Sequence, residues 1–168
     1  MEILLELGAD INARYHDFDA GTTPLALASW HGEVDIVKFL LSKGANGTAK
    51  DSKGRNTLHF MTFHLPERHG SLHFAWHYWI RHGNWDEHLY QMTELTRLLT
   101  EGGADIEALD QVYPQHTPIV MASAAGVWDG GATCALLSLG ADVNDSRGAA
   151  GDTGEAPSRI LLSYLHTN

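Results

Sequence analysis

The sequence predicts an all-α fold, a solenoid of antiparallel helix pairs with short hairpin loops and one long insertion. Two observations predict it. First, a pair of leucines recurs along the chain. After each pair and two or three further residues come a glycine, an alanine and an acidic or amide residue. The four copies end at Asp10, Asn46, Asp105 and Asp142. Second, a capping residue precedes an apolar stretch at Thr23, Asn56 and Thr117. Such repetition is the signature of a fold of stacked units.

The chain opens within the last part of such a unit. Residues 1–7 have the pattern of a helix end, and Gly8 is its expected stop because glycine tolerates the left-handed C-cap. With no helix before it, this helix would leave Ile3, Leu4 and Leu7 poorly covered, whereas terminal repeats usually carry a polar outer face. We therefore expect a fragment, or an alternative start, of a longer array.

The first complete unit is expected over residues 14–49. Thr23 is an expected N-cap, and Pro24 follows at the first helical position, where proline is tolerated. A second helix is expected after Gly32, because apolar residues recur there at helical spacing. They are Val34, Ile36, Val37, Phe39, Leu40 and Leu41.

The second unit, residues 50–109, is longer than the others. Asn56 is its expected cap, and threonine replaces proline after it. Gly44 and Gly103 are 59 residues apart, compared with 36 between Gly8 and Gly44. The surplus predicts an insertion at about 64–88, before a second helix around residues 92–99.

The third unit is expected over residues 110–145. Thr117 and Pro118 repeat the helix entry, and Cys134 falls in the apolar second helix, where we expect it to be buried. Residues 146–152 have the composition of a loop, and residues 158–166 form an expected closing helix.

These features resemble the ankyrin repeat, a hairpin and two antiparallel helices of about 33 residues. Thr23-Pro24-Leu25, Gly32 and Gly44-Ala45 fall at the offsets of that family, although Ala26 replaces the signature histidine. The resemblance covers roughly residues 1–62 and 89–160. It implies a single domain, 1–168. Its parts are a partial repeat (1–13), repeats 14–49, 50–109 and 110–145, and a C-terminal capping repeat (146–168).

The resemblance also implies a function, because ankyrin arrays generally bind other proteins through hairpin tips and the inner face of the first helices. The variable, exposed positions of the family map here mainly to aromatic and apolar residues. They are Tyr15, Phe18, Leu27, Trp30, His31, Arg55, Phe60, Phe63, Tyr113 and Met121. Two interpretations of Trp30 remain open: it lies exposed on this surface, or it packs against the next repeat or the insertion.

The composition limits the kinds of partner that the chain is expected to bind. The net charge is −10 and the eleven basic residues are scattered, which argues against nucleic acid. No apolar run is long enough for a membrane span, and no signal segment opens the chain. One cysteine allows no disulfide framework within the chain. We therefore expect an intracellular protein, cytoplasmic or nuclear, whose partner is a basic or apolar protein or peptide.

The expected insertion has unusual chemistry. Seven of the eleven histidines fall between His59 and His88, with tryptophan and tyrosine interleaved. His69, His73 and His77 are each four residues apart, so on a helix they would share one face, as paired zinc ligands do. Glu67, Asp86, Glu87 or His88 could supply a further ligand. The alternative is that these histidines hydrogen-bond, pack or face solvent, and that the aromatic residues dock the insertion on the solenoid.

Two functions of different classes follow. The first is a non-catalytic protein-interaction module without a cofactor. The second is a small-molecule or zinc site between the insertion and the solenoid, possibly catalytic, in which His59, His64 or His77 acts as acid or base. No nucleophile elbow or phosphate-binding loop supports hydrolase or nucleotide chemistry.

Overall fold

The computed structural model describes residues 2–15, 21–62, 85–112, 115–124 and 130–144. Within these ranges the regular elements are seven helices, and one isolated β-bridge joins Tyr15 to Thr22. The prediction of an all-α fold is confirmed. The predicted closing helix lies outside the described residues.

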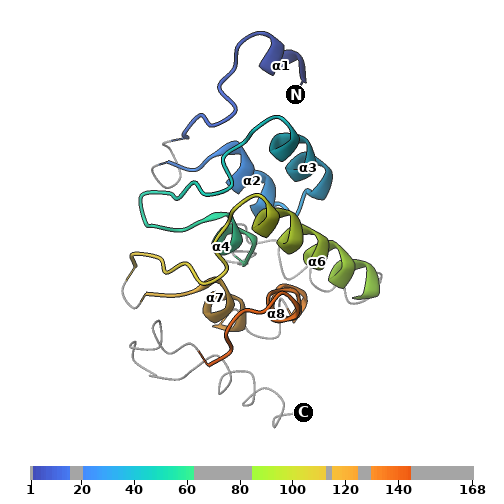
Figure 1. The fold of residues 1–168 in the computed structure, drawn as a ribbon, viewed down its shortest axis with the longest axis vertical. Coiled ribbons are helices and arrows are strands. Elements are labelled where there is room, and N and C mark those ends of the chain that lie inside the picture. The colour runs from blue at the N-terminus through green and yellow to red at the C-terminus, as the bar shows by residue number, and fades with distance from the viewer. Residues whose placement is uncertain (1, 16–20, 63–84, 113–114, 125–129, 145–168) are drawn as a thin grey trace, which may run out of the picture.

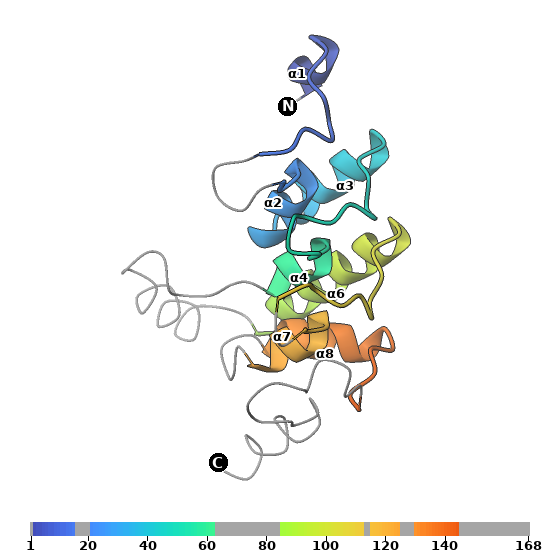
Figure 2. The same cartoon turned by 90° about the vertical axis from the view of Figure 1, so that its left-hand side faces the viewer.

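The helices form two layers that run along the molecule (Figure 1). A short helix α1 (Glu2–Glu6) comes first. The inner layer consists of α2 (Pro24–Trp30), α4 (Thr57–Thr62) and α7 (Pro118–Ala124). The outer layer consists of α3 (Val34–Ser42), α6 (Trp85–Glu101) and α8 (Gly130–Ser138). The turned view shows the same stacking of helix pairs, one below another (Figure 2).

The inner helices begin where the capping residues predict. The Thr23 hydroxyl accepts a hydrogen bond from the Ala26 nitrogen at 3.3 Å, and Pro24 is the first helical residue. The Asn56 Oδ1 accepts hydrogen bonds from the nitrogens of Leu58 and His59, at 3.1 and 3.2 Å. These bonds satisfy backbone donors that the first helical turn leaves unpaired. The predicted caps Thr23 and Asn56 are confirmed, whereas the predicted cap Thr117 is wrong, because its buried hydroxyl has no hydrogen-bond partner among the described residues.

The outer helices end on glycine, as the sequence predicts. Gly44, Gly103 and Gly140 have positive φ angles of 88°, 97° and 92°. The alanine after each glycine donates its backbone N–H to a leucine carbonyl one turn back, at 2.9 to 3.0 Å. This is the C-cap geometry that favours glycine.

A tight turn follows each of these stops. The side chains of Asp10, Asn46, Asp105 and Asp142 each accept a hydrogen bond from the backbone nitrogen two residues further on, at 2.9, 3.0, 3.0 and 2.9 Å. Aspartate and asparagine favour such turns because the short side chain reaches its own backbone. The recurring motif of glycine, alanine and an acidic or amide residue therefore encodes the same turn in each repeat.

The core lies between the layers. The largest apolar side chains in it are almost completely buried: Leu25, Val37, Leu58, Met61, Leu95, Leu99, Ile119 and Leu136. Glycine permits the closest approaches. A β-carbon on Gly131 of α8 would lie 2.8 Å from the ring of His88 on α6. A β-carbon on Gly47 would lie 2.1 Å from the carbonyl oxygen of Gly102 in the next repeat.

Two details differ from the sequence prediction. Helix α6 begins at Trp85, earlier than the helix expected around residues 92–99, so residues 85–88 of the predicted insertion are helical. Cys134 is exposed rather than buried, because it occupies the outward position that Lys38 and Arg97 hold in the other outer helices. In α1, Ile3 and Leu7 are 70% and 79% exposed, as expected.

Candidate partner-binding surface

The inner helices place three apolar residues at the same position of successive repeats. Each inner helix is entered in the same way, so Leu27, Phe60 and Met121 are all fourth residues of their helices. The neighbours of Leu27 in α2, Ala26 and Ala28, are buried, whereas Leu27 itself is half-buried. Met121 is half-buried too. Since α2 packs against α4, and α4 against α7, the three equivalent positions follow one another along the inner layer as an apolar column. Its middle residue, Phe60, is buried, and the other two are half-exposed.

Trp30 and His31 extend this column at the end of α2. Trp30 is half-buried, and its ring lies 5.1 Å from the ring of His31, tilted by 35°. His31 is exposed and is the C-cap of the helix. Trp30 is thus neither fully exposed nor fully buried.

The hairpin loops lie beside the inner layer and project to the left in Figure 1. Tyr15 is 46% exposed, and its backbone N–H donates to the Thr22 carbonyl at 2.9 Å. Successive hairpins are tied together. The Arg14 guanidinium donates to the Lys50 carbonyl at 2.9 Å, and the Gln111 nitrogen donates to the Lys53 carbonyl. These hydrogen bonds therefore connect each hairpin to the next one along the array.

The expected exposure of Arg55 and Phe60 is wrong. Arg55 is buried, and its guanidinium binds the buried carboxylate of Asp51 through Nε at 2.7 Å and Nη2 at 2.6 Å. The same Asp51 accepts backbone hydrogen bonds from Lys53 and Arg55 at 2.9 and 2.8 Å. The guanidinium carbon lies 5.0 Å from the centre of the Phe60 ring, and Phe60 is 7% exposed. These two side chains stabilise the hairpin.

His59 is also structural. It is completely buried, its Nε2 lies 3.0 Å from the His116 carbonyl oxygen, and its Nδ1 lies 2.7 Å from the Asn56 Oδ1. Burial lowers the pKa of His59 below 6.5, more strongly than the hydrogen bond to His116 raises it. The ring joins two repeats and has no access to a substrate.

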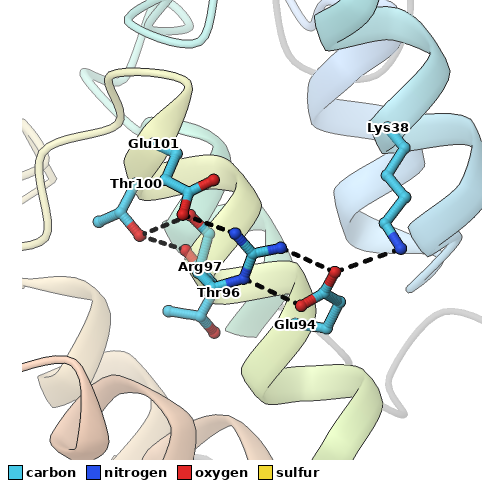
Figure 3. A network of polar contacts seen from close by, with 6 residues as sticks. All are labelled: Lys38, Glu94, Thr96, Arg97, Thr100 and Glu101. Carbon is cyan, nitrogen blue, oxygen red and sulfur yellow. Dashed lines mark hydrogen bonds and ion pairs between the residues drawn. The ribbon is translucent and has the colours of Figure 1, made fainter.

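The outer surface between α3 and α6 carries a charged network (Figure 3). Arg97 binds Glu94 at 2.9 Å and Glu101 at 2.6 Å, and Lys38 of α3 binds Glu94 at 3.2 Å. The hydrogen bonds from Arg97 and then Lys38 lower the pKa of Glu94 to about 2. The charges of this face are therefore engaged with one another, in contrast to the half-exposed apolar side chains of Leu27 and Met121 on the inner layer.

Several predicted residues lie outside the described ranges. They are Phe18, Phe63, Tyr113, His69, His73 and His77. In the part of the chain that the structure describes, no three histidine, cysteine, aspartate or glutamate side chains converge as a metal site would require. No helix among the described residues has the length and hydrophobicity to span a bilayer.

Sequence reasoning missed two features. Arg14 links two hairpins, and only its place next to the bridged Tyr15 hints at this role. Tyr90 is 64% exposed on the first half of α6, whereas the sequence prediction placed it between the insertion and the helix expected around residues 92–99.

Comparison with known proteins agrees with this geometry. A family profile of ankyrin repeats, described in three copies, matches residues 1–61. The ankyrin repeat protein nuc-2 of Neurospora crassa is 34% identical over 128 residues, which is 75% of this chain. The human transient receptor potential cation channel subfamily A member 1 is 45% identical over 58 residues, or 34% of this chain. The alignments span 9% and 5% of the lengths of these two relatives.

Proposed function

This chain is an ankyrin-repeat protein, and we propose that it is a non-catalytic module that binds another protein along the inner layer and the hairpin edge. Ankyrin repeats generally mediate contacts between proteins. One observation supports the proposed surface most strongly: Leu27 and Met121 occupy equivalent positions of different repeats and remain half-exposed. Trp30 adds the kind of large amphipathic side chain that often dominates interface energy.

The chemistry of this surface favours a partner segment with apolar side chains. The column offers leucine, methionine and tryptophan, and methionine adapts its shape to a bound side chain. The exposed hairpin residues Tyr15, Gln111 and Val112 would form a mixed rim, as is usual around an apolar interface centre. The net charge of −10 favours a basic flank on that partner. We place this interaction inside the cell, where a chain with one free cysteine stays reduced.

Photo-crosslinking tests which layer binds. A photoreactive amino acid is introduced at Leu27 in one variant and at Tyr90 in another, and each is irradiated in a cell extract. Leu27 lies on the inner layer and Tyr90 on the outer layer, so the two variants differ in the face that they probe. We expect specific adducts from position 27 only. Adducts of equal yield and identity from position 90 would refute the inner-layer surface.

A zinc site at His69, His73 and His77 is our alternative proposal. Its support is the spacing of four residues between histidines, which suits ligands on one helical face. The purified chain is analysed for metal, and its melting temperature is measured with EDTA and with added zinc. Stoichiometric metal that is lost in a His73→Ala variant would favour this alternative. Metal-free protein with an unchanged melting temperature would exclude it.

A further inference from the structure

We propose that Asn46 is a site of deamidation, at which the backbone nitrogen of Gly47 attacks the side-chain carboxamide of Asn46. These residues form the tight turn after helix α3. The equivalent turns begin with Asp10, Asp105 and Asp142, so this repeat alone among the four described turns has an amide there.

The carboxamide is arranged to react. Its oxygen Oδ1 accepts two hydrogen bonds from Thr48, one from the hydroxyl at 2.7 Å and one from the backbone nitrogen at 3.0 Å. When a nucleophile adds to the carboxamide carbon, negative charge develops on this oxygen, and donors already in place stabilise that charge. Asn46 is exposed, so water can enter and ammonia can leave.

The nucleophile, the Gly47 nitrogen, belongs to a buried residue but has no competing hydrogen bond: among the described residues, no acceptor takes one from the Gly47 N–H. Glycine has no β-carbon to crowd the attack. The fold also requires glycine here, because a β-carbon on Gly47 would lie 2.1 Å from the Gly102 carbonyl oxygen. Packing between repeats therefore keeps a reactive Asn-Gly pair in this turn.

The hydroxyl donor is held by packing. A β-carbon on Gly103 would lie 3.0 Å from the Thr48 methyl carbon, so this methyl group lies against the next repeat. With the methyl fixed, the hydroxyl of Thr48 remains directed at the Asn46 Oδ1.

The reaction needs only water. The Gly47 nitrogen loses its proton and forms a bond to the Asn46 carboxamide carbon, while the bond from that carbon to the amide nitrogen breaks. Ammonia leaves with the transferred proton, and a five-membered succinimide remains. Water then opens either carbonyl of the ring, which gives aspartate or isoaspartate. Nothing is oxidised or reduced.

The two products differ in their effect on the array. Aspartate fits the turn, because Asp10, Asp105 and Asp142 already make the same hydrogen bond in the other repeats. Isoaspartate lengthens the main chain by one carbon. It would displace Gly47 from Gly102 and break the 2.8 Å bond from the Asn46 nitrogen to the Asn12 Oδ1. Both products add a negative charge, and only isoaspartate also loosens the contact between repeats.

Peptide mapping by mass spectrometry tests the proposal. The full chain is incubated folded in mildly alkaline buffer, and in parallel unfolded in urea, and the amide-to-acid mass change is followed. Asn12 and Asn56, which precede Ala13 and Thr57, are the internal references. We expect Asn46 to react many-fold faster than both references in the folded chain. An Asn46 that reacts in urea but not in the folded chain would overturn the proposal.

Two matched variants test the role of the hydroxyl. Thr48→Val keeps the methyl contact and removes the hydroxyl donor, so we expect deamidation of Asn46 to slow several-fold. Thr48→Ser keeps the hydroxyl but loses the methyl contact with the next repeat, so we expect a rate between those of Thr48→Val and the parent. Circular dichroism confirms that both variants fold. An unchanged rate in Thr48→Val would show that the hydrogen bond does not assist the reaction.

Discussion

The inner and outer layers of this solenoid are built from the same repeats but are held in different ways. The inner helices span six or seven residues and depend on caps, the buried Arg55–Asp51 ion pair and the His59 contact. The outer helices span 9 or 17 residues, and they bury long apolar faces. The inner layer is thus positioned by polar contacts in addition to its buried apolar side chains, and one of these contacts, from His59 to His116, joins two repeats. The outer layer is positioned mainly by packing.

The difference bears on where a partner can bind. On the outer face, Lys38, Glu94, Arg97 and Glu101 satisfy one another (Figure 3). On the inner face, Leu27 and Met121 are half-exposed at equivalent positions, with Trp30 alongside. An apolar column on rigid helices is a better binding surface than charges that already have partners.

The largest loss of stability is expected when a side chain packed between the layers is truncated. Leu136 of α8 is completely buried, whereas the adjacent Leu137 is 37% exposed. We expect Leu136→Ala to lower the free energy of unfolding by about 2–5 kcal/mol, because it leaves a cavity. Leu137→Ala is the matched control, with a much smaller expected loss. Urea titrations measure both, and equal losses would mean that α8 is packed in another register.

The next effect is expected in the polar framework of the inner layer. Arg55→Met would leave the buried Asp51 carboxylate without its charge partner, at a cost of about 3 kcal/mol. Lys50→Met on the same hairpin is the control, because Lys50 is exposed. Thermal melts of both variants give the comparison. An Arg55 variant as stable as the Lys50 variant would show that the ion pair contributes nothing.

A smaller effect is expected from pH through His59. Because burial lowers its pKa below 6.5, the unfolded chain binds a proton that the folded chain excludes. This contribution to stability is complete above pH 6.5 and is lost as the pH falls below that value. Lys50, Arg55, Asp110 and His116 are the groups that face the ring.

A variant isolates this contribution. We expect His59→Gln to lose less stability than the parent between neutral and mildly acidic pH, as measured by urea unfolding at each pH. Parent and variant with the same loss would assign the pH dependence to other groups.

Much of this fold could be predicted because repeats encode local structure. Thr23, Asn56 and the glycines at 44, 103 and 140 act within a few residues of their own position, so sequence spacing alone reveals their roles. Burial was harder to predict. Phe60 and Arg55 occupy positions that the family leaves exposed, but their side chains contact each other over the hairpin.

The errors have two physical causes. Whether Arg55 faces solvent depends on Asp51 and Phe60, and pairing between side chains is not visible in a periodic pattern. Cys134 is exposed, whereas its place in an apolar helix predicts burial. That helix is made of small residues, so its sequence gives little amphipathic signal about which side faces outward.

The comparison of the two faces is tested most directly by the affinity of a crosslinked partner for two alanine variants. Trp30→Ala changes the inner surface, and Tyr90→Ala removes an exposed aromatic ring from the outer helix α6. Isothermal titration should show binding at least tenfold weaker for Trp30→Ala, the result of losing about 1.4 kcal/mol or more at a central contact. Tyr90→Ala should bind as the parent does. Weaker binding for Tyr90→Ala, with Trp30→Ala unchanged, would contradict an inner-layer binding surface.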